Sequence, residues 1–350
     1  MKRIIPAMIM ALGALIAVLA VLPGCDDLIT QYNYDTTFIT IQDSTCVAAC
    51  HSDANMDMLI AIRQWEHSRH SSDSLIDFDE FGLGLENTKT CGPQCHNQEG
   101  FITSLQSSVD EIEFPLEIGC FSCHAPHTYW ELDSLRYYDP VVLADGFTYN
   151  RGNSNICALC HQATATVASA ITDQIDLLDS VTIYPSWAAH ASNQADMMMG
   201  TGGYEYGAGP GNSAHYNASG SNCVKCHMNV AIGFELGGHS FTMESDGDQL
   251  VEACNVSGCH IGSPLTGFTD VSADQTSFID SLSILHTALE TKGITDDYAG
   301  KIGDAGLAGA LYNYRFIIND GSNGVHNTDY ALGLIRESLI YLDTATSLNP

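Results

Sequence analysis

Cysteine and histidine recur together along this chain, in a pattern that can anchor a metal-containing group. Six times, two cysteines have two to four residues between them, and a histidine directly follows the second cysteine. We number these sites 1 to 6 in chain order: Cys46, Cys50, His51; Cys91, Cys95, His96; Cys120, Cys123, His124; Cys157, Cys160, His161; Cys223, Cys226, His227; and Cys254, Cys259, His260. Two thiols can form thioethers while the adjacent imidazole binds iron, so C-x-x-C-H is read as a haem attachment site.

The six sites differ in the number of residues between their cysteines. Sites 3, 4 and 5 have two, sites 1 and 2 have three, and site 6 has four. The wider sites must loop out one or two residues while keeping the histidine directly after the second cysteine. All six keep that step, so we expect six covalent haem c groups, with the twelve site cysteines as cofactor-binding residues and the six site histidines as proximal iron ligands.

Disulfides and zinc are the alternatives to haem at these sites. Six cysteine pairs in an exported chain can form a disulfide framework, but disulfides place no demand on the next residue. With 14 histidines in 350 residues, a histidine should follow a given cysteine about one time in 25. Zinc needs four ligands per ion, so two sites would have to combine. The repeated Cys-His step favours haem.

The series resembles the multihaem c-type cytochromes of bacterial respiratory chains and covers most of the exported chain. The resemblance implies electron transfer between closely stacked haems, across the envelope or outside the cell. Six haems in so short a chain leave much of the core to porphyrin. We therefore expect a mainly α fold, organised by haem over residues 46–270, with short helices, long irregular loops and little β structure.

The first 24 residues are typical of a signal peptide: Met1 to Arg3 are basic and an apolar run follows. A retained transmembrane anchor is the alternative. The string Leu-Pro-Gly-Cys that ends at Cys25 resembles a lipobox, which implies that Cys25 is lipidated and that 25–45 is a tether. We expect an exported protein, lipid-anchored at the periplasmic face, the outer membrane or the cell surface.

The charge balance bears on the partners. The chain carries 42 Asp and Glu against 12 Lys and Arg. Such an acidic protein is unsuited to nucleic acid. It should favour redox proteins with basic docking surfaces, or extracellular metal cations and mineral surfaces.

Eight histidines lie outside the six sites and can supply distal iron ligands. We favour His70, His127, His190, His215, His239 and His326. His127 lies three residues beyond a proximal histidine, a position from which related cytochromes often reach a neighbouring haem. His67 is one helical turn from His70, so only one of the two should reach iron. His286 lies on an apolar helix face and is expected to be a packed core histidine.

The segment 271–350 has no haem site and is expected to be a small helical unit that packs on the haem domain. Helical spacing predicts helices at 273–292, about 304–318 and 328–344, the last capped by Asn327. The string D-G-S-N-G-V-H-N resembles the C-terminal segment of ammonia-forming nitrite reductases, which implies a distal role for His326. Further helical stretches are expected at about 56–70 and 164–181.

Residues 187–216 are rich in glycine but lack the context of a phosphate loop. We interpret the glycines as allowing close approach to a porphyrin. Met197 to Met199 are expected to pack against a haem edge rather than to bind iron.

The favoured function is electron transfer through six low-spin haems, each with two histidine ligands and therefore without a catalytic residue. A reductase of nitrite, hydroxylamine or a sulfur oxyanion is the enzymatic alternative, but such nitrite reductases commonly mark the open haem with lysine, and no C-x-x-C-K string occurs here. A subunit of an extracellular cytochrome filament is the third possibility, because surplus histidines permit self-assembly.

The number of attached haems tests the wider sites. The mature protein, purified from a haem-maturing host, should carry six covalent haems by intact mass. A mass corresponding to four or fewer would contradict the assignment of all three wider sites as haem sites.

Overall fold

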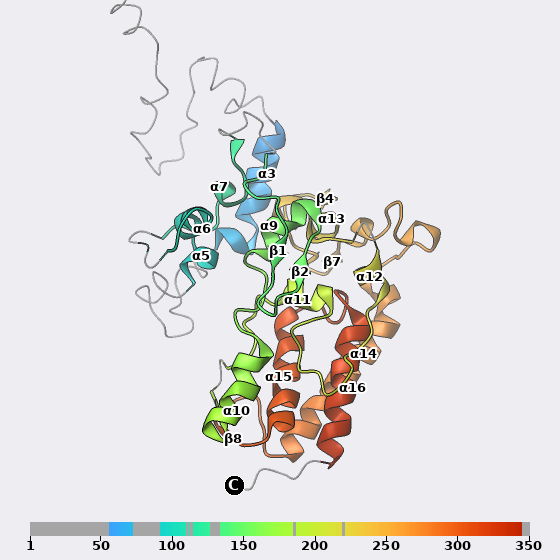
Figure 1. The fold of residues 1–350 in the computed structure, drawn as a ribbon. Coiled ribbons are helices and arrows are strands. Elements are labelled where there is room, and N and C mark those ends of the chain that lie inside the picture. Colours follow the sequence, from blue (N-terminus) through green and yellow to red (C-terminus); the bar gives the residue numbers. More distant parts are fainter. Residues whose placement is uncertain are drawn as a thin grey trace, which may run out of the picture. The chain divides into compact units, whose positions relative to one another are not determined.

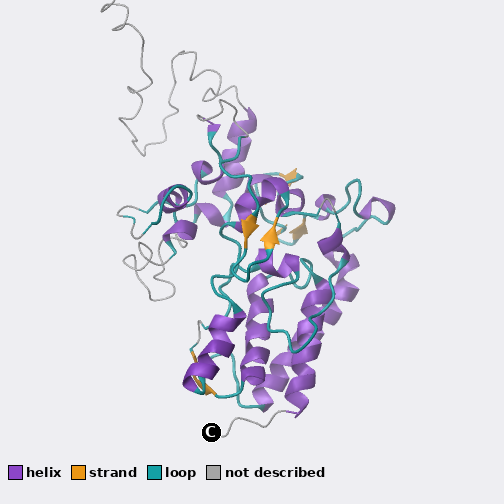
Figure 2. Cartoon of the chain, viewed as in Figure 1, coloured by secondary structure: helices purple, strands orange, loops and turns teal. Residues whose placement is uncertain are grey.

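The computed structural model describes residues 56–72, 92–109, 112, 115–126, 134–184, 187–218 and 221–344. The chain divides into two units, 1–52 and 53–350, and the first lies wholly outside these ranges. The predictions for site 1 and for Cys25, Cys91 and His127 also fall outside them. In the second unit helices predominate, strands are short, and long loops join them (Figure 2). The expectation of a mainly α fold with long loops is thus confirmed.

Up to residue 262 the helices are short. The α-helices are α3 (Met56–Glu66), α5 (Pro93–His96), α6 (Gln98–Ser104), α7 (Cys120–Cys123), α9 (Asn155–Ala158), α10 (Asp173–Leu178), α11 (Gln194–Met199), α12 (Ala214–Asn217) and α13 (Cys223–His227). Single 3-10 turns form η2 (Arg69–Ser71), η5 (Gly152–Ser154), η7 (Gly238–Ser240), η8 (Val251–Ala253) and η9 (His260–Gly262), while η6 (Ala168–Thr172) is π-helical.

The predicted helix at 56–70 is therefore α3 followed by the turn η2. The predicted helix at 164–181 is η6 and α10, and it stops early. Asp179 adopts a left-handed conformation (φ 57°) and Val181 starts a strand, so the last part of that prediction is wrong.

The described strands form four antiparallel pairs rather than a larger sheet. These are β1 (Val141–Val142) with β2 (Thr148–Tyr149), β3 (Val181–Ile183) with β8 (Gly300–Ile302), β4 (Ala231–Ile232) with β5 (Leu236–Gly237), and β6 (Glu244–Ser245) with β7 (Asp248–Gln249). The β3–β8 pair joins the middle of the chain to the segment before α15, with Val181 opposite Ile302.

Three long helices follow: α14 (Phe268–Thr291), α15 (Ala305–Asp320) and α16 (Thr328–Thr344). They lie side by side (Figure 1). Asp304 caps α15 by accepting a hydrogen bond from the Leu307 amide at 2.7 Å. The predicted cap of α16 is in place, since the Asn327 side chain accepts from the Tyr330 amide at 3.4 Å.

The largest apolar core lies between these helices and the segment from η6 to α11. Phe278, Leu285 and Leu289 of α14 are buried there, as their helical spacing predicts, with Phe316 of α15 and Leu334 of α16. Two smaller clusters centre on Tyr149 and on Leu250. None of the three clusters includes any of the described residues between 56 and 126. None of the described helices is long and apolar enough to span a bilayer.

The glycine-rich loop packs on the C-terminal helices. A Cβ at Gly203 would come within 2.5 Å of Leu334, and the Gly203 amide donates to the Tyr330 hydroxyl at 3.0 Å. Asn313 of α15 accepts from the Tyr204 amide at 2.7 Å and donates to the Tyr204 carbonyl at 2.8 Å. These contacts of the loop are with helices, and close approach of its glycines to a porphyrin stays a prediction. Met197 to Met199 are buried in core clusters.

Loss of the Asn313 side chain should weaken the anchoring of this loop. Asn313 is fully buried and also donates to the Ser338 hydroxyl at 3.0 Å. Asn313→Ala leaves a buried amide and carbonyl without partners, which should lower the free energy of unfolding by about 2–4 kcal/mol. Urea unfolding followed by circular dichroism measures the change. Thr287→Ala, on the exposed face of α14, is the control and should change it by less than about 0.5 kcal/mol.

Candidate haem-binding sites

Sites 3, 4 and 6 share a backbone closure. The histidine amide donates to the carbonyl of the first cysteine at 2.9 Å in site 3 (His124 to Cys120) and at 2.9 Å in site 4 (His161 to Cys157). Site 6 makes the same closure at 3.1 Å, from His260 to Cys254, despite four intervening residues. Gly258 takes a left-handed conformation (φ 86°) within the extra length. The wider spacing of site 6 is therefore looped out, as the sequence analysis required.

Sites 2 and 5 lie on short helices. Cys95 and His96 are in α5, whose N-cap Gly92 is left-handed (φ 65°). Site 5 makes up the whole of α13, and its N-cap Asn222 accepts a hydrogen bond from the Lys225 amide at 2.8 Å. A single helical turn thus places each second cysteine and its histidine beside one another.

Each described site histidine lies next to one histidine from elsewhere in the chain. The ring centroids are 5.8 Å apart for His96 and His190, 6.1 Å for His124 and His239, 6.1 Å for His161 and His70, 6.4 Å for His227 and His326, and 6.3 Å for His260 and His215. All five partners belong to the predicted distal set.

These separations match the demands of a six-coordinate haem iron. Metal–imidazole bonds are about 2 Å long, so two imidazoles that share one iron have centroids about 6 Å apart. Each pair could therefore hold one iron, with the adjacent cysteines available for thioethers. The arrangement fits haem c at each of the five described sites.

The two spare histidines are placed differently. His67 is exposed, whereas His70, one turn later, packs edge-on against Phe241 with centroids 4.8 Å apart. His286 stacks on Tyr314, and its Nε2 lies 2.9 Å from Asp296 Oδ1. Its side chain is 30 % exposed, so the expectation of a packed core histidine is wrong. Polar Asp296 and the Tyr314 ring hold it at the helix surface instead.

In five of the paired histidines, Nδ1 lies within hydrogen-bond distance of an oxygen. Nδ1 of His161 lies 3.1 Å from Gln194 Oε1, Nδ1 of His190 lies 3.1 Å from Ser192 Oγ, Nδ1 of His215 lies 2.7 Å from the Val325 carbonyl, Nδ1 of His227 lies 2.9 Å from the Phe241 carbonyl, and Nδ1 of His326 lies 2.6 Å from Asp320 Oδ1. Such partners fix ring orientation and leave Nε2 to bind iron.

Burial favours the neutral imidazole that metal binding requires. It lowers the pKa of His70 to about 4, with a contribution from nearby His161. Burial also lowers the pKa of His190 and, with His124 adding to the effect, that of His239. Burial likewise lowers the pKa of His227.

The cysteines carry no sign of the alternative chemistries. None of the nine cysteines that the structure describes forms a disulfide. Within the same ranges, no three His, Cys, Asp or Glu side chains gather as a metal site. Burial raises the pKa of Cys123 and of Cys226 to about 11, whereas hydrogen bonds with Cys160 and Cys157 lower the pKa of Cys95 and of Cys223, respectively.

Neighbouring sites share residues. The Cys160 thiol of site 4 contacts the Gln94 carbonyl of site 2 at 3.8 Å. Ser154, just before site 4, bonds Asn222 and the Val224 amide of site 5, both at 3.0 Å. Phe241 accepts from His227 of site 5, and its ring contacts His70, the partner of His161 in site 4. Sites 2, 4 and 5 are therefore adjacent in space.

The loop between α15 and α16 serves two sites at once. It carries His326 beside site 5, and its Val325 carbonyl holds His215 beside site 6. Gly324 lies against the Phe278 ring of α14, so the loop rests on the C-terminal core. The roles of Asp320 and Phe241 as hydrogen-bond partners of His326 and His227 were not predicted from the sequence. Asp320 left one signal there, because it begins the D-G-S-N-G-V-H-N string.

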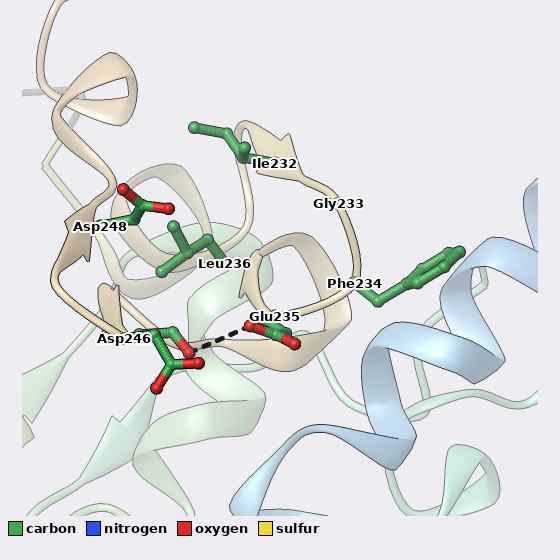
Figure 3. Close-up of a pocket in the computed structure, with 8 residues that line it drawn as sticks. Ile232, Gly233, Phe234, Glu235, Leu236, Asp246 and Asp248 are labelled. Carbon is green, nitrogen blue, oxygen red and sulfur yellow. Dashed lines mark hydrogen bonds between the residues drawn. The ribbon is translucent and has the colours of Figure 1, made fainter.

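A surface pocket of about 310 Å³ lies away from these pairs (Figure 3). Hairpins β4–β5 and β6–β7 line it, and the Ser245 hydroxyl donates to Glu235 at 3.3 Å across it. It includes none of the predicted cysteines or histidines.

The choice between His70 and His67 can be tested by spectroscopy. His70→Ala should convert one haem to the high-spin state, because its distal position opens. The matched variant His67→Ala should keep every haem low-spin, since His67 is exposed. Low-temperature EPR of the oxidised proteins distinguishes them. A high-spin signal from His67→Ala alone would reverse the assignment.

Comparison with known proteins points in the same direction. The chain is 26 % identical over 240 residues to the C-type polyheme cytochrome OmcB of Geobacter sulfurreducens, and 25 % identical over 240 residues to OmcC of the same organism. The match covers 54 % of this chain but only 31 % of OmcB and 30 % of OmcC. No family model and no solved structure matches. Over about half of its length the chain is thus similar to distant relatives named as polyheme c-type cytochromes, which supports a multihaem c-type cytochrome.

Proposed function

We propose that this protein carries electrons through six covalently bound haems c, each held between two histidines. The observation that carries the proposal is the set of five histidine pairs, each joining a haem-attachment motif to a distant part of the chain at a separation of 5.8–6.4 Å. The distant similarity to polyheme cytochromes supports the same function.

The proposed axial pairs follow from these contacts. They are His96 with His190, His124 with His239, His161 with His70, His227 with His326, and His260 with His215. The remaining predicted ligands His51 and His127 lie outside the described residues.

Two histidine ligands favour electron transfer over catalysis. Each haem, when bound, accepts and releases one electron at its iron. With both axial positions filled by protein, a substrate has no free position to bind. Shared residues such as Phe241 keep neighbouring sites close, which suits rapid transfer between them.

The described sites lie on short helices joined by long loops, which supports a fold built around haem there. We propose that haem supplies part of the apolar core. Residues 46–270 would then form the haem domain, with 271–350 packed on it.

Export and partners are part of the proposal. The basic start, apolar run and Cys25 support an exported lipoprotein, with residues 25–45 as its tether. The net charge of −30 favours basic redox proteins or metal cations and minerals as partners.

EPR of the oxidised wild-type protein tests the function. We expect low-spin signals alone, unchanged when nitrite or hydroxylamine is added, because every iron is six-coordinate. A stoichiometric high-spin signal that shifts with either compound would instead indicate a multihaem reductase with one open haem. The measurement needs no knowledge of the physiological partners.

A further inference from the structure

The histidine beside site 5 is bonded to a buried carboxylate. Asp320 Oδ1 lies 2.6 Å from Nδ1 of His326, and the Asp320 side chain is only 2 % exposed. His161, His190, His215 and His227 use neutral oxygens instead, from an amide, a hydroxyl and two backbone carbonyls. The partner of His326 therefore differs from these four partners, because it is a negatively charged carboxylate.

The loop is built to hold this contact. Asp320 is the last residue of α15, and Gly321 turns the chain in a left-handed conformation (φ 69°). The Ser322 hydroxyl donates to Asp320 Oδ2, and the His326 amide donates to the same hydroxyl at 3.2 Å. Both carboxylate oxygens of Asp320 thus accept hydrogen bonds from groups within the loop itself.

Such a bond changes the histidine as a ligand. An imidazole that donates Nδ1–H to a carboxylate gains basicity at Nε2 and becomes a stronger donor to a metal. A stronger donor and a nearby negative charge both stabilise the ferric over the ferrous iron. Because Asp320 is buried, solvent ions screen that charge weakly. On the opposite side, His227 also donates its Nδ1–H, to the Phe241 carbonyl at 2.9 Å.

We propose that Asp320, through His326, lowers the reduction potential of the haem at site 5. The inference rests on the proposed function, which places that haem between His227 and His326. Asp320 is a positioning residue, because it acts through His326 and does not touch the iron. Reduction adds one electron to the iron, from a mediator or redox partner, and neither breaks nor forms a bond.

Asp320→Asn is the direct test, since the amide oxygen can still accept from Nδ1–H while the charge is lost. The low-spin EPR signal that disappears in His326→Ala identifies the haem, and redox titration of that signal gives its potential. At the wild-type midpoint, we expect Asp320→Asn to move the ratio of reduced to oxidised haem about tenfold toward the reduced form, or about 59 mV for one electron. Asp320→Ala should shift it in the same direction.

Asp296→Asn is the matched control. Asp296 Oδ1 also lies beside a histidine, 2.9 Å from Nε2 of His286, but the ring that His286 stacks on is Tyr314 and not a site histidine. This variant should leave the titration unchanged. A shift of less than twofold in Asp320→Asn, or an equal shift in Asp296→Asn, would overturn the role of Asp320.

The His326→Ala variant separates this inference from the proposed function. Appearance of one high-spin haem would support His326 as a ligand, so a failed Asp320 titration would then refute the carboxylate effect alone. If no high-spin haem appears, the assignment of His326 is wrong and the inference falls with it.

Discussion

The separation between paired imidazoles is the constraint on which the rest of the structure depends. A six-coordinate iron between two histidines requires ring centroids about 6 Å apart, and little variation is possible because metal–nitrogen bonds are short. One histidine of each pair is fixed locally, by the turn that closes its cysteine motif. The other must be delivered from a distant segment, as when His70 meets His161 or His326 meets His227. Short helices and long loops suit this task, since each need place only one side chain.

The C-terminal helices contribute to the sites without binding haem themselves. Their packed core supports the loop between α15 and α16, and Phe278 lies directly beneath Gly324 of that loop. From this platform His326 reaches site 5, and the Val325 carbonyl orients His215 toward site 6. A conventional apolar core therefore stabilises the position of one predicted distal ligand at each of two sites. The glycine-rich loop packs on the same helices through Asn313 and Tyr330.

Local features could be predicted from the sequence because they depend on spacing alone. The cysteine-histidine motifs are contiguous, and the helices α14 to α16 follow from apolar periodicity and from caps such as Asn327. The choice of partner for each site histidine could not be predicted, because it is set by tertiary packing. Sequence spacing favoured His70 only weakly over His67, whereas in the structure one packs on Phe241 and the other faces solvent. Iron ligation by these residues stays a prediction.

The errors have physical causes of the same kind. Glycine predicted close approach, and at Gly203 the groups approached are Leu334 and Tyr330, while contact of this loop with a porphyrin stays a prediction. His286 lies on the helix face that periodicity marked as apolar, yet it lies beside Asp296 at the surface. The supporting oxygens of Asp320 and Phe241 were overlooked because a hydrogen bond to a ligand leaves no periodic trace in the sequence.

The most direct test of the account is a crystal structure of the haem-loaded protein with the irons located by anomalous scattering. We expect six irons. Five of them should lie between the two rings of a histidine pair described above, within bonding distance of both Nε2 atoms of that pair. Irons that lack the second histidine, or that join a site histidine to a different partner, would contradict the account.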